Sequence, residues 1–164
     1  MKKVIVIGCS GSGKSYFSRK LSEQTGIERY HLDMIWWKED GTNIERNEFD
    51  EKLGEILAKD AWIIDGNYQR TMERRINACD TVIFFDIPLE ECIDGIRARK
   101  GKPRPDMMWQ AAPEEDDAEF MEFVRNYNIN NRPQVLELLK MYSRKNIVVF
   151  ESRCEADDFL SQLK

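Results

Sequence analysis

Residues 4–15 read Val4-Ile5-Val6-Ile7-Gly8-Cys9-Ser10-Gly11-Ser12-Gly13-Lys14-Ser15. Four consecutive β-branched residues ended by a glycine predict a strand that is buried on both faces, as in a parallel sheet. Glycines at positions 8, 11 and 13 allow a tight turn of the backbone, and helical character begins at Lys14. The stretch therefore predicts a strand, a glycine-rich loop and a helix in direct succession.

The loop, residues 8–15, satisfies the pattern G-x-x-x-x-G-K-[ST] in the strand-to-helix setting that the pattern requires. Glycines let backbone N–H groups turn inward on a phosphate, and the positive end of the helix dipole adds to them. Lys14 is expected to neutralise the β- and γ-phosphates, and the Ser15 hydroxyl to bind Mg²⁺. The loop therefore predicts binding of a nucleoside triphosphate, ATP or a close relative such as GTP, with Mg²⁺.

Short apolar runs and segments of helical character alternate along the rest of the chain. We expect further strands at residues 29–32, 61–64, 81–85 and 146–150. We expect helices at residues 14–24, 48–59, 69–77, 89–99, 114–127, 133–142 and 156–163. This alternation predicts an α/β fold with right-handed crossovers, and 164 residues fit a single domain, 1–164.

The composition is that of a globular protein, with 41% hydrophobic and 34% charged residues. A net charge of −5 repels polyanions, so we expect no direct nucleic-acid partner and no anionic membrane partner. The four cysteines are scattered without a C-x-x-C pair, which favours reduced thiols over a disulfide framework or a structural metal. The apolar run near the N-terminus is too short for a signal peptide or a membrane span. We therefore expect a cytoplasmic protein, either a monomer or a homodimer.

Three aspartates end predicted strands, at positions 33, 65 and 86, and the carboxyl ends of parallel strands are where ligands bind in open α/β sheets. Phosphoryl transfer needs one carboxylate for magnesium and another to orient the attacking hydroxyl, so three candidates compete for two roles. Asp65 follows an apolar run and precedes Gly66-Asn67, which favours it for Mg²⁺ over a plain turn residue. Asp33 is the candidate for orienting an acceptor or a metal-bound water, its alternative being a helix cap.

The remaining polar and aromatic residues near these strand ends are open to two interpretations. Asp86 is equally compatible with a purely structural role. His31, the single histidine, is interpreted as a packed, hydrogen-bonded residue and not as a catalyst. Trp36 and Trp37 are expected in an exposed segment, where one of them packs on the core or lines an acceptor pocket.

A basic segment interrupts the alternation of strands and helices, with five cations among residues 97–104 of an otherwise acidic chain. Prolines follow closely, and an acidic run at residues 114–119 comes after them. Such a charge run is compatible with a solvated face. Guanidinium groups on a loop opposite a phosphate loop would instead stabilise charge on a transferred phosphoryl group. We therefore expect a lid at about residues 97–117, called the lid region below.

With these residues assembled, the chain resembles the adenylate-kinase-like branch of P-loop kinases, and most closely the bacterial DNA topology modulation (FlaR-like) proteins. The resemblance extends over nearly the whole length. Its specific parts are residues 8–15, His31-Leu32-Asp33 followed by Trp36-Trp37, Trp62-Ile63-Ile64-Asp65-Gly66-Asn67-Tyr68, Ile83-Phe84-Phe85-Asp86-Ile87-Pro88, and Arg99 with Arg104-Pro105-Asp106.

This resemblance implies a P-loop NTPase three-layer α/β/α sandwich, with five parallel strands in the order 2-3-1-4-5 and a lid insertion. It also implies an adenine slot near Ser152-Arg153 and phosphoryl transfer from ATP to a small acceptor. One departure concerns the acceptor: Asn67-Tyr68 stands where nucleotide kinases have Phe-Pro-Arg, so the arginine that would clamp an acceptor phosphate is missing. Arg70, Arg74 or Arg75 could substitute for it.

Three functions remain to be compared. The first is a small-molecule or nucleotide kinase, the second a nucleotide-dependent regulatory switch with weak ATPase activity, and the third a DNA-binding regulator, against which the charge argues. For the kinase, the candidate catalytic residues are Lys14, Asp33, Arg99 and Arg104, and the candidate magnesium ligands are Ser15 and Asp65. The candidate nucleotide contacts are Gly8, Ser10, Gly11, Ser12, Gly13, Lys14, Ser15, Tyr16, Arg97 and Arg153.

Overall fold

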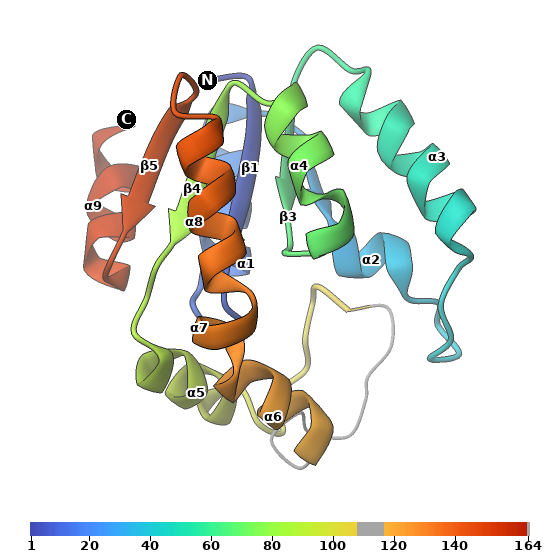
Figure 1. Cartoon of the computed structure of the whole chain (residues 1–164), viewed down its shortest axis with the longest axis vertical. Coiled ribbons are helices and arrows are strands. Elements are labelled where there is room, and N and C mark those ends of the chain that lie inside the picture. Colours follow the sequence, from blue (N-terminus) through green and yellow to red (C-terminus); the bar gives the residue numbers. More distant parts are fainter. Residues whose placement is uncertain (108–116, 164) are drawn as a thin grey trace.

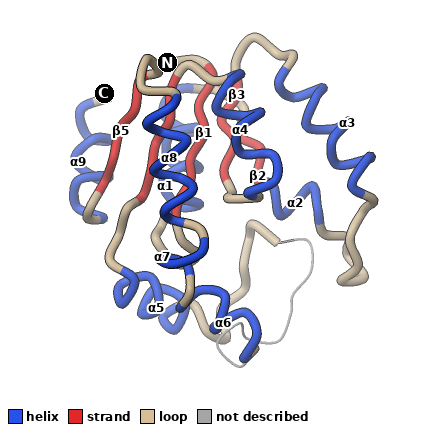
Figure 2. Tube along the Cα trace, in the orientation of Figure 1, coloured by secondary structure: helices blue, strands red, loops and turns tan. Residues whose placement is uncertain are grey.

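The sheet of the computed structural model, which describes residues 1–107 and 117–163, has five parallel strands (Figures 1 and 2). The strands are β1 (Lys3–Gly8), β2 (Arg29–His31), β3 (Trp62–Asp65), β4 (Thr81–Phe85) and β5 (Asn146–Phe150). They lie in the order β2-β3-β1-β4-β5 with every neighbouring pair parallel. The five expected strands and their order 2-3-1-4-5 are therefore confirmed.

Helices cover both faces of the sheet, because each central strand directs alternate side chains to opposite sides. Val4 and Val6 of β1 belong to one hydrophobic core, and Ile5 and Ile7 to the other. The first core includes α1 (Lys14–Thr25), α5 (Leu89–Ala98), α6 (Ala118–Arg125) and α9 (Arg153–Gln162). The second includes α3 (Arg46–Leu57), α4 (Gln69–Ala78) and α8 (Arg132–Met141). This is the expected three-layer α/β/α sandwich.

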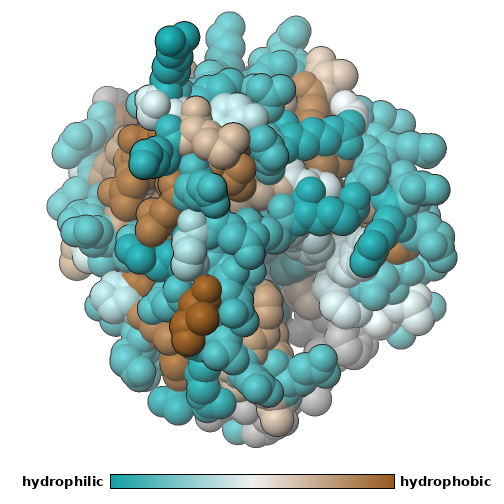
Figure 3. Space-filling model, viewed as in Figure 1, coloured by the Kyte–Doolittle hydropathy of each residue, from teal (hydrophilic) through white to brown (hydrophobic). Residues whose placement is uncertain are grey.

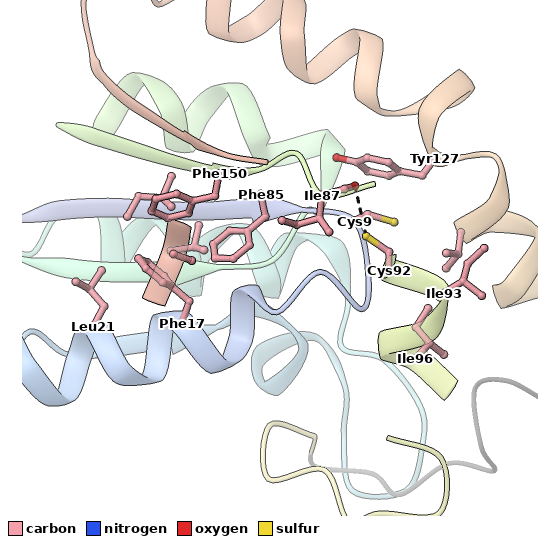
Figure 4. Packing of buried hydrophobic residues seen from close by; sticks show 14 of the residues in the cluster. Cys9, Phe17, Leu21, Phe85, Ile87, Cys92, Ile93, Ile96, Tyr127 and Phe150 are labelled. Atoms are coloured by element: carbon pink, nitrogen blue, oxygen red, sulfur yellow. Dashed lines mark hydrogen bonds between the residues drawn. The ribbon is translucent and has the colours of Figure 1, made fainter. Parts of the chain in front are cut away.

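Aromatic rings fill the first core near the centre of the sheet (Figure 4). Phe17 of α1 meets Phe85 of β4 with ring centroids 5.3 Å apart, and Phe150 of β5 at 5.4 Å, both edge to face. Edge-to-face pairs of this kind add to the free energy gained by burying the rings. They fix α1, the helix that follows the glycine-rich loop, against β4 and β5.

Several strand and helix boundaries differ from the expected ones by a few residues, and two of these differences lie at the carboxyl ends of strands. The predicted strand at residues 29–32 ends at His31, and Leu32 begins the short helix α2 (Leu32–Trp36), so Trp36 is not in an open segment. Helix α9 begins at Arg153, three residues before the predicted start, because Ser152 caps it by accepting a hydrogen bond from the Glu155 backbone N–H. The Ser-x-x-Glu pattern at residues 152–155 is a capping box that would have located this start.

The carboxyl ends of the strands point toward α5, α6 and the short helix α7 (Tyr127–Asn130), which lie below the sheet edge in Figure 1. Of the lid region, residues 97–107 and 117 are described, and the predicted helix at 114–127 begins at Ala118 in the described residues. The positions 108–116 lie outside the described residues. A helix able to span a bilayer is absent from the described part of the chain.

Candidate functional site

The glycine-rich loop joins β1 to α1 and is held by close backbone packing. A Cβ atom on Gly11 would lie 2.0 Å from the Cys92 carbonyl oxygen of α5, and Gly11 has a left-handed φ of 80°. Gly13, at the N-cap of α1, has φ 105° and supplies no side-chain cap. The first backbone N–H groups of α1 are therefore open to an anion, as phosphate binding requires.

Arg153, the first residue of α9, supports this loop through hydrogen bonds to its backbone. Its Nη2 donates to the Gly11 and Glu91 carbonyl oxygens, each at 2.9 Å, and its Nε to the Ser12 carbonyl at 3.4 Å. The guanidinium group thus joins the glycine-rich loop to α5 and α9. Our sequence-based expectation placed Arg153 at an adenine slot; in the structure its polar atoms are used by the loop backbone.

Lys14 extends along the loop into a cavity of about 1000 Å³, which is at the upper end of the ~300–1,000 Å³ typical of small-molecule sites. Its Nζ donates to the Cys9 carbonyl oxygen at 3.3 Å, and burial lowers its pKa below the ordinary value. Figure 3 shows a hollow below α4 on the face of the molecule seen in Figure 1. The cavity is lined by Ser10, Lys14 and Ser15 of the loop, by His31, Asp33 and Trp37, by residues 66–69, by Ile96 and Met107, by residues 99–104, and by Asp117, Phe120, Phe123 and Asn131.

Asp33, at the start of α2, faces this cavity and is held from two sides. The Tyr68 hydroxyl donates to Asp33 Oδ1 at 2.6 Å, and His31 Nε2 lies 3.3 Å from Asp33 Oδ2. Burial alone would raise the pKa of Asp33. The contact with His31 and the positive charge of that ring nevertheless hold the pKa of Asp33 well below its usual range. Asp33 is therefore an ionised carboxylate held by one hydrogen bond from Tyr68 and one ion pair with His31.

His31 is buried between two carboxylates, Asp33 and Asp65. Its Nδ1 pairs with Asp65 Oδ1. Burial alone would lower the pKa of His31, but the hydrogen bonds and negative charges of Asp33 and Asp65 raise it to about 9. His31 is thus a packed, hydrogen-bonded residue that also lines the cavity. Its positive charge stabilises the ionised carboxylates of Asp33 and Asp65.

Asp65 has no exposed surface, and its oxygens are occupied by the protein. Besides His31, the carboxylate accepts hydrogen bonds from Ser18 Oγ at 2.5 Å and from Arg29 Nε at 2.6 Å. Burial alone would raise the pKa of Asp65, but His31 first, and then Arg29 and Ser18, hold it below its ordinary value. The sequence predicted Asp65 as a magnesium ligand. In the structure, it lies behind the cavity wall and reaches the cavity through His31.

Tyr68 lies in the part of the cavity wall that follows β3, and the buried Arg75 holds this segment from behind the wall. Tyr68 has a left-handed φ of 37°, the single positive φ of a non-glycine residue among residues 1–107 and 117–163, and such backbone strain is common at functional sites. Arg75 is fully buried and its guanidinium donates to the Gly66 carbonyl at 2.8 Å, to the Tyr68 carbonyl at 3.1 Å and to the Asn67 carbonyl. Arg75 therefore holds the segment that presents the Tyr68 hydroxyl to Asp33.

Neither of the other arginines of α4 enters the cavity. Arg70 makes a two-bond pair with the Asp50 carboxylate at 2.7 and 3.0 Å, and Arg74 donates to the Asp50 carbonyl oxygen at 3.2 Å. Asp50 belongs to α3, so both arginines are directed away from Asp33 and toward α3. None of the three residues that we considered as substitutes for a phosphate clamp lines the cavity.

The basic segment and the tryptophans are divided between the cavity and other places. Arg99 and Arg104 line the cavity, whereas Arg97 lies on α5, 3.7 Å from Asp94. Trp37 lines the cavity, whereas Trp36 packs edge to face on Phe49 with a centroid distance of 5.7 Å. Trp36 is therefore the tryptophan that packs on the core, and Trp37 is the one that lines the cavity.

The other candidates lie outside the cavity. Tyr16 is 53% exposed on α1 and is not part of the cavity lining. Asp86 makes a two-bond pair with Arg132 at 2.7 and 2.8 Å, which ties β4 to α8. Gly8 packs against Phe85, and the Ser12 side chain is buried.

Three residues in or behind the wall of the site were not among our sequence-based candidates: Ser18, Arg29 and Tyr68. Arg75 was considered only as a phosphate clamp, whereas in the structure it holds backbone carbonyl groups. A cation at the start of a short strand, as Arg29 is, needs a buried partner, and this signal was available in the sequence. The role of Arg75 had no such signal, because its partners are backbone carbonyls that any residues could supply.

Solved structures similar to this chain include kinases. A shikimate kinase from Acinetobacter baumannii in complex with shikimate covers 99% of this chain and 90% of its own, with a TM-score of 0.63 and 16% identity. This chain has the fold of that kinase. A shikimate kinase from Bacteroides thetaiotaomicron (15% identity, 98% and 94% covered) and a gluconokinase from Sinorhizobium meliloti 1021 (14%, 99% and 89%) each give a TM-score of 0.55.

At these identities the likeness shows the fold alone. No family model matches the sequence, and the comparison with curated proteins gives no match.

Proposed function

We propose that this chain is a kinase that transfers the γ-phosphate of ATP to a hydroxyl group of a small-molecule or nucleoside-like acceptor. The observation that carries the proposal is one shared cavity, into which Lys14 and Ser15 of the glycine-rich loop, Asp33, and Arg99 and Arg104 of the lid region all open. Phosphoryl transfer depends on positioning and on stabilising charge, and these residues supply both.

The triphosphate would lie on the open N-terminus of α1, with Lys14 against its terminal phosphates and Arg99 and Arg104 on the far side. Mg²⁺ fits the residues present. Ser15 offers a hydroxyl at the cavity wall, and no group of three carboxylate, His or Cys ligands occurs among the described residues. A magnesium ion held by phosphates, water and one or two protein oxygens needs no such group. The bound ion would neutralise charge on the phosphates.

The acceptor hydroxyl would donate its hydrogen bond to Asp33, whose direction is fixed by Tyr68 and His31. Trp37 and Tyr68 would contact the body of the acceptor. Because Arg70, Arg74 and Arg75 are committed to Asp50 and to backbone carbonyls, an acceptor phosphate would find no clamp on α4. This favours an acceptor that needs no such clamp over a nucleoside monophosphate.

The resemblance to topology modulation proteins also belongs to this proposal, because it rests in part on the same glycine-rich loop, residues 8–15. With a net charge of −5, we expect any effect on DNA to be indirect. Cytoplasmic localisation remains a prediction.

Single-turnover transfer from γ-labelled ATP with Mg²⁺ tests the proposal across nucleosides, nucleoside monophosphates and hydroxylated metabolites. Lys14→Ala should abolish labelling of the acceptor. Lys20→Ala, on the same helix but exposed and paired with Glu23 at 2.8 Å, is the matched control and should retain it. If no compound is labelled and only slow, acceptor-independent phosphate release occurs, the kinase proposal fails and the nucleotide-dependent switch takes its place.

A further inference from the structure

Asp106 connects the lid region to the body of the protein. Its Oδ1 accepts a hydrogen bond from Arg29 Nη1 at 3.0 Å, although the two residues are 77 positions apart. Both side chains are largely buried, with exposed fractions of 14% and 15%. A second contact of Asp106, to Arg19 on α1, is longer at 3.8 Å and more exposed. The Arg29 contact is thus the stronger tie between this loop and the sheet.

Arg29 is at the same time part of the buried group beside the cavity. Its Nε lies 2.6 Å from Asp65 Oδ2 and 2.8 Å from Ser18 Oγ, while its Nη1 is the atom that holds Asp106. Asp65 in turn pairs with His31, and His31 Nε2 faces Asp33. A continuous row of charged groups therefore runs from the lid region to Asp33, in the order Asp106, Arg29, Asp65, His31 and Asp33.

We propose that Arg29 is a positioning residue that fixes the loop at residues 99–107 through Asp106 and, through Asp65 and His31, the direction of Asp33. The planar guanidinium suits this role, because its nitrogen atoms can bind two carboxylates on different sides at fixed angles, which an ammonium group cannot do. Arg104 and Met107, the neighbours of this contact, line the cavity. The inference rests on the proposed function only for its consequence, that the lid cations and Asp33 are positioned together for phosphoryl transfer.

The anchoring part of the proposal is tested by limited trypsin cleavage of the full chain after Arg99 or Lys100, without nucleotide. Cleavage of a transiently open loop follows the population of its open form. Loss of one hydrogen bond between charged groups should speed cleavage about tenfold in Asp106→Ala. Asp106→Asn, which can still accept a weaker bond from Arg29, should be intermediate. Arg19→Ala removes the exposed contact to the same carboxylate and should stay within about twofold of wild type.

The link to Asp33 is tested by the NMR signals of the His31 ring, which are unambiguous because His31 is the single histidine of the chain. Asp106→Ala should shift these signals and Arg19→Ala should not. Unchanged cleavage in Asp106→Ala would overturn the anchor. Faster cleavage with unchanged His31 signals would overturn the second part of the proposal, the effect of Arg29 on Asp33. Arg29 would then hold only the loop at residues 99–107. Neither measurement uses phosphoryl transfer, so a failure of the kinase proposal in the acceptor panel is distinguishable from a failure here.

Discussion

Replacing Tyr68 by Phe removes the hydroxyl that donates to Asp33 at 2.6 Å and leaves the ring in place. The ring is stacked on Phe49 with a centroid distance of 5.4 Å and meets Trp36 at 6.4 Å, and both contacts should survive. A hydrogen bond to a charged group contributes about 1.5–3 kcal/mol to the free energy of unfolding. Asp33 is 30% exposed to the cavity, so water can replace the lost donor and the cost should lie near the lower end, about 1.5 kcal/mol.

Urea unfolding followed by tryptophan fluorescence measures this difference through the transition midpoint at an unchanged slope. Tyr142→Phe is the matched control, because its exposed hydroxyl donates to Glu73 at 3.1 Å and its loss should change the free energy of unfolding by less than about 0.5 kcal/mol. Equal effects of the two substitutions would refute the argument that Tyr68 holds a constrained carboxylate. If the proposed function is correct, Tyr68→Phe should also lower the rate of transfer to the acceptor more than it lowers ATP affinity.

Two further predictions concern the loop and the buried histidine. Gly95→Ala would place a Cβ 2.3 Å from the Gly11 carbonyl oxygen and should destabilise the protein by about 1–3 kcal/mol and weaken ATP binding. Gly54→Ala in α3 meets only the flexible end of Arg74 and should be neutral or stabilising, and equal urea midpoints for the two variants would contradict the close packing of the loop. The pKa of His31 is raised from 6.5 to about 9, so its protonated form stabilises the folded state fully below pH ~6.5 and this contribution is lost as the pH rises through about 9. The loss amounts to at most ~3 kcal/mol, and an NMR titration of His31 with an ordinary midpoint, together with a flat stability between pH 6 and 10, would contradict it.

The fold was accessible from the sequence because its signals are local. The β-branched run at residues 4–7 and the glycines at positions 8, 11 and 13 report on neighbours along the chain, and alternation of strands and helices follows from the same kind of pattern. The strand order required the resemblance to known kinases, since no local pattern encodes which strands are adjacent. The short helix after His31 was missed because its five residues carry too little periodicity to be recognised.

The site was accessible only in part, because its side chains are brought together by the sheet edge. The sequence put three aspartates at strand ends, yet each has a different surrounding in the structure. Asp86 faces Arg132, Asp65 is enclosed by Ser18, Arg29 and His31, and Asp33 alone opens into the cavity. These differences arise from partners that lie 34 to 47 positions away along the chain, and no spacing rule predicts them.

If the proposed function is correct, the surroundings of Asp33 determine which part it takes in phosphoryl transfer. A general base works best with a pKa near the working pH, whereas the pKa of Asp33 is held well below its usual range by His31 and Tyr68. A carboxylate of that kind removes protons poorly but accepts a hydrogen bond in a fixed direction at any physiological pH. In a loose transition state for phosphoryl transfer, the attacking hydroxyl needs alignment more than early deprotonation. The contacts with Tyr68 and His31 therefore suit Asp33 to aligning the acceptor, and Arg29, which reaches Asp33 through Asp65 and His31, would align it with the same loop that carries Arg104.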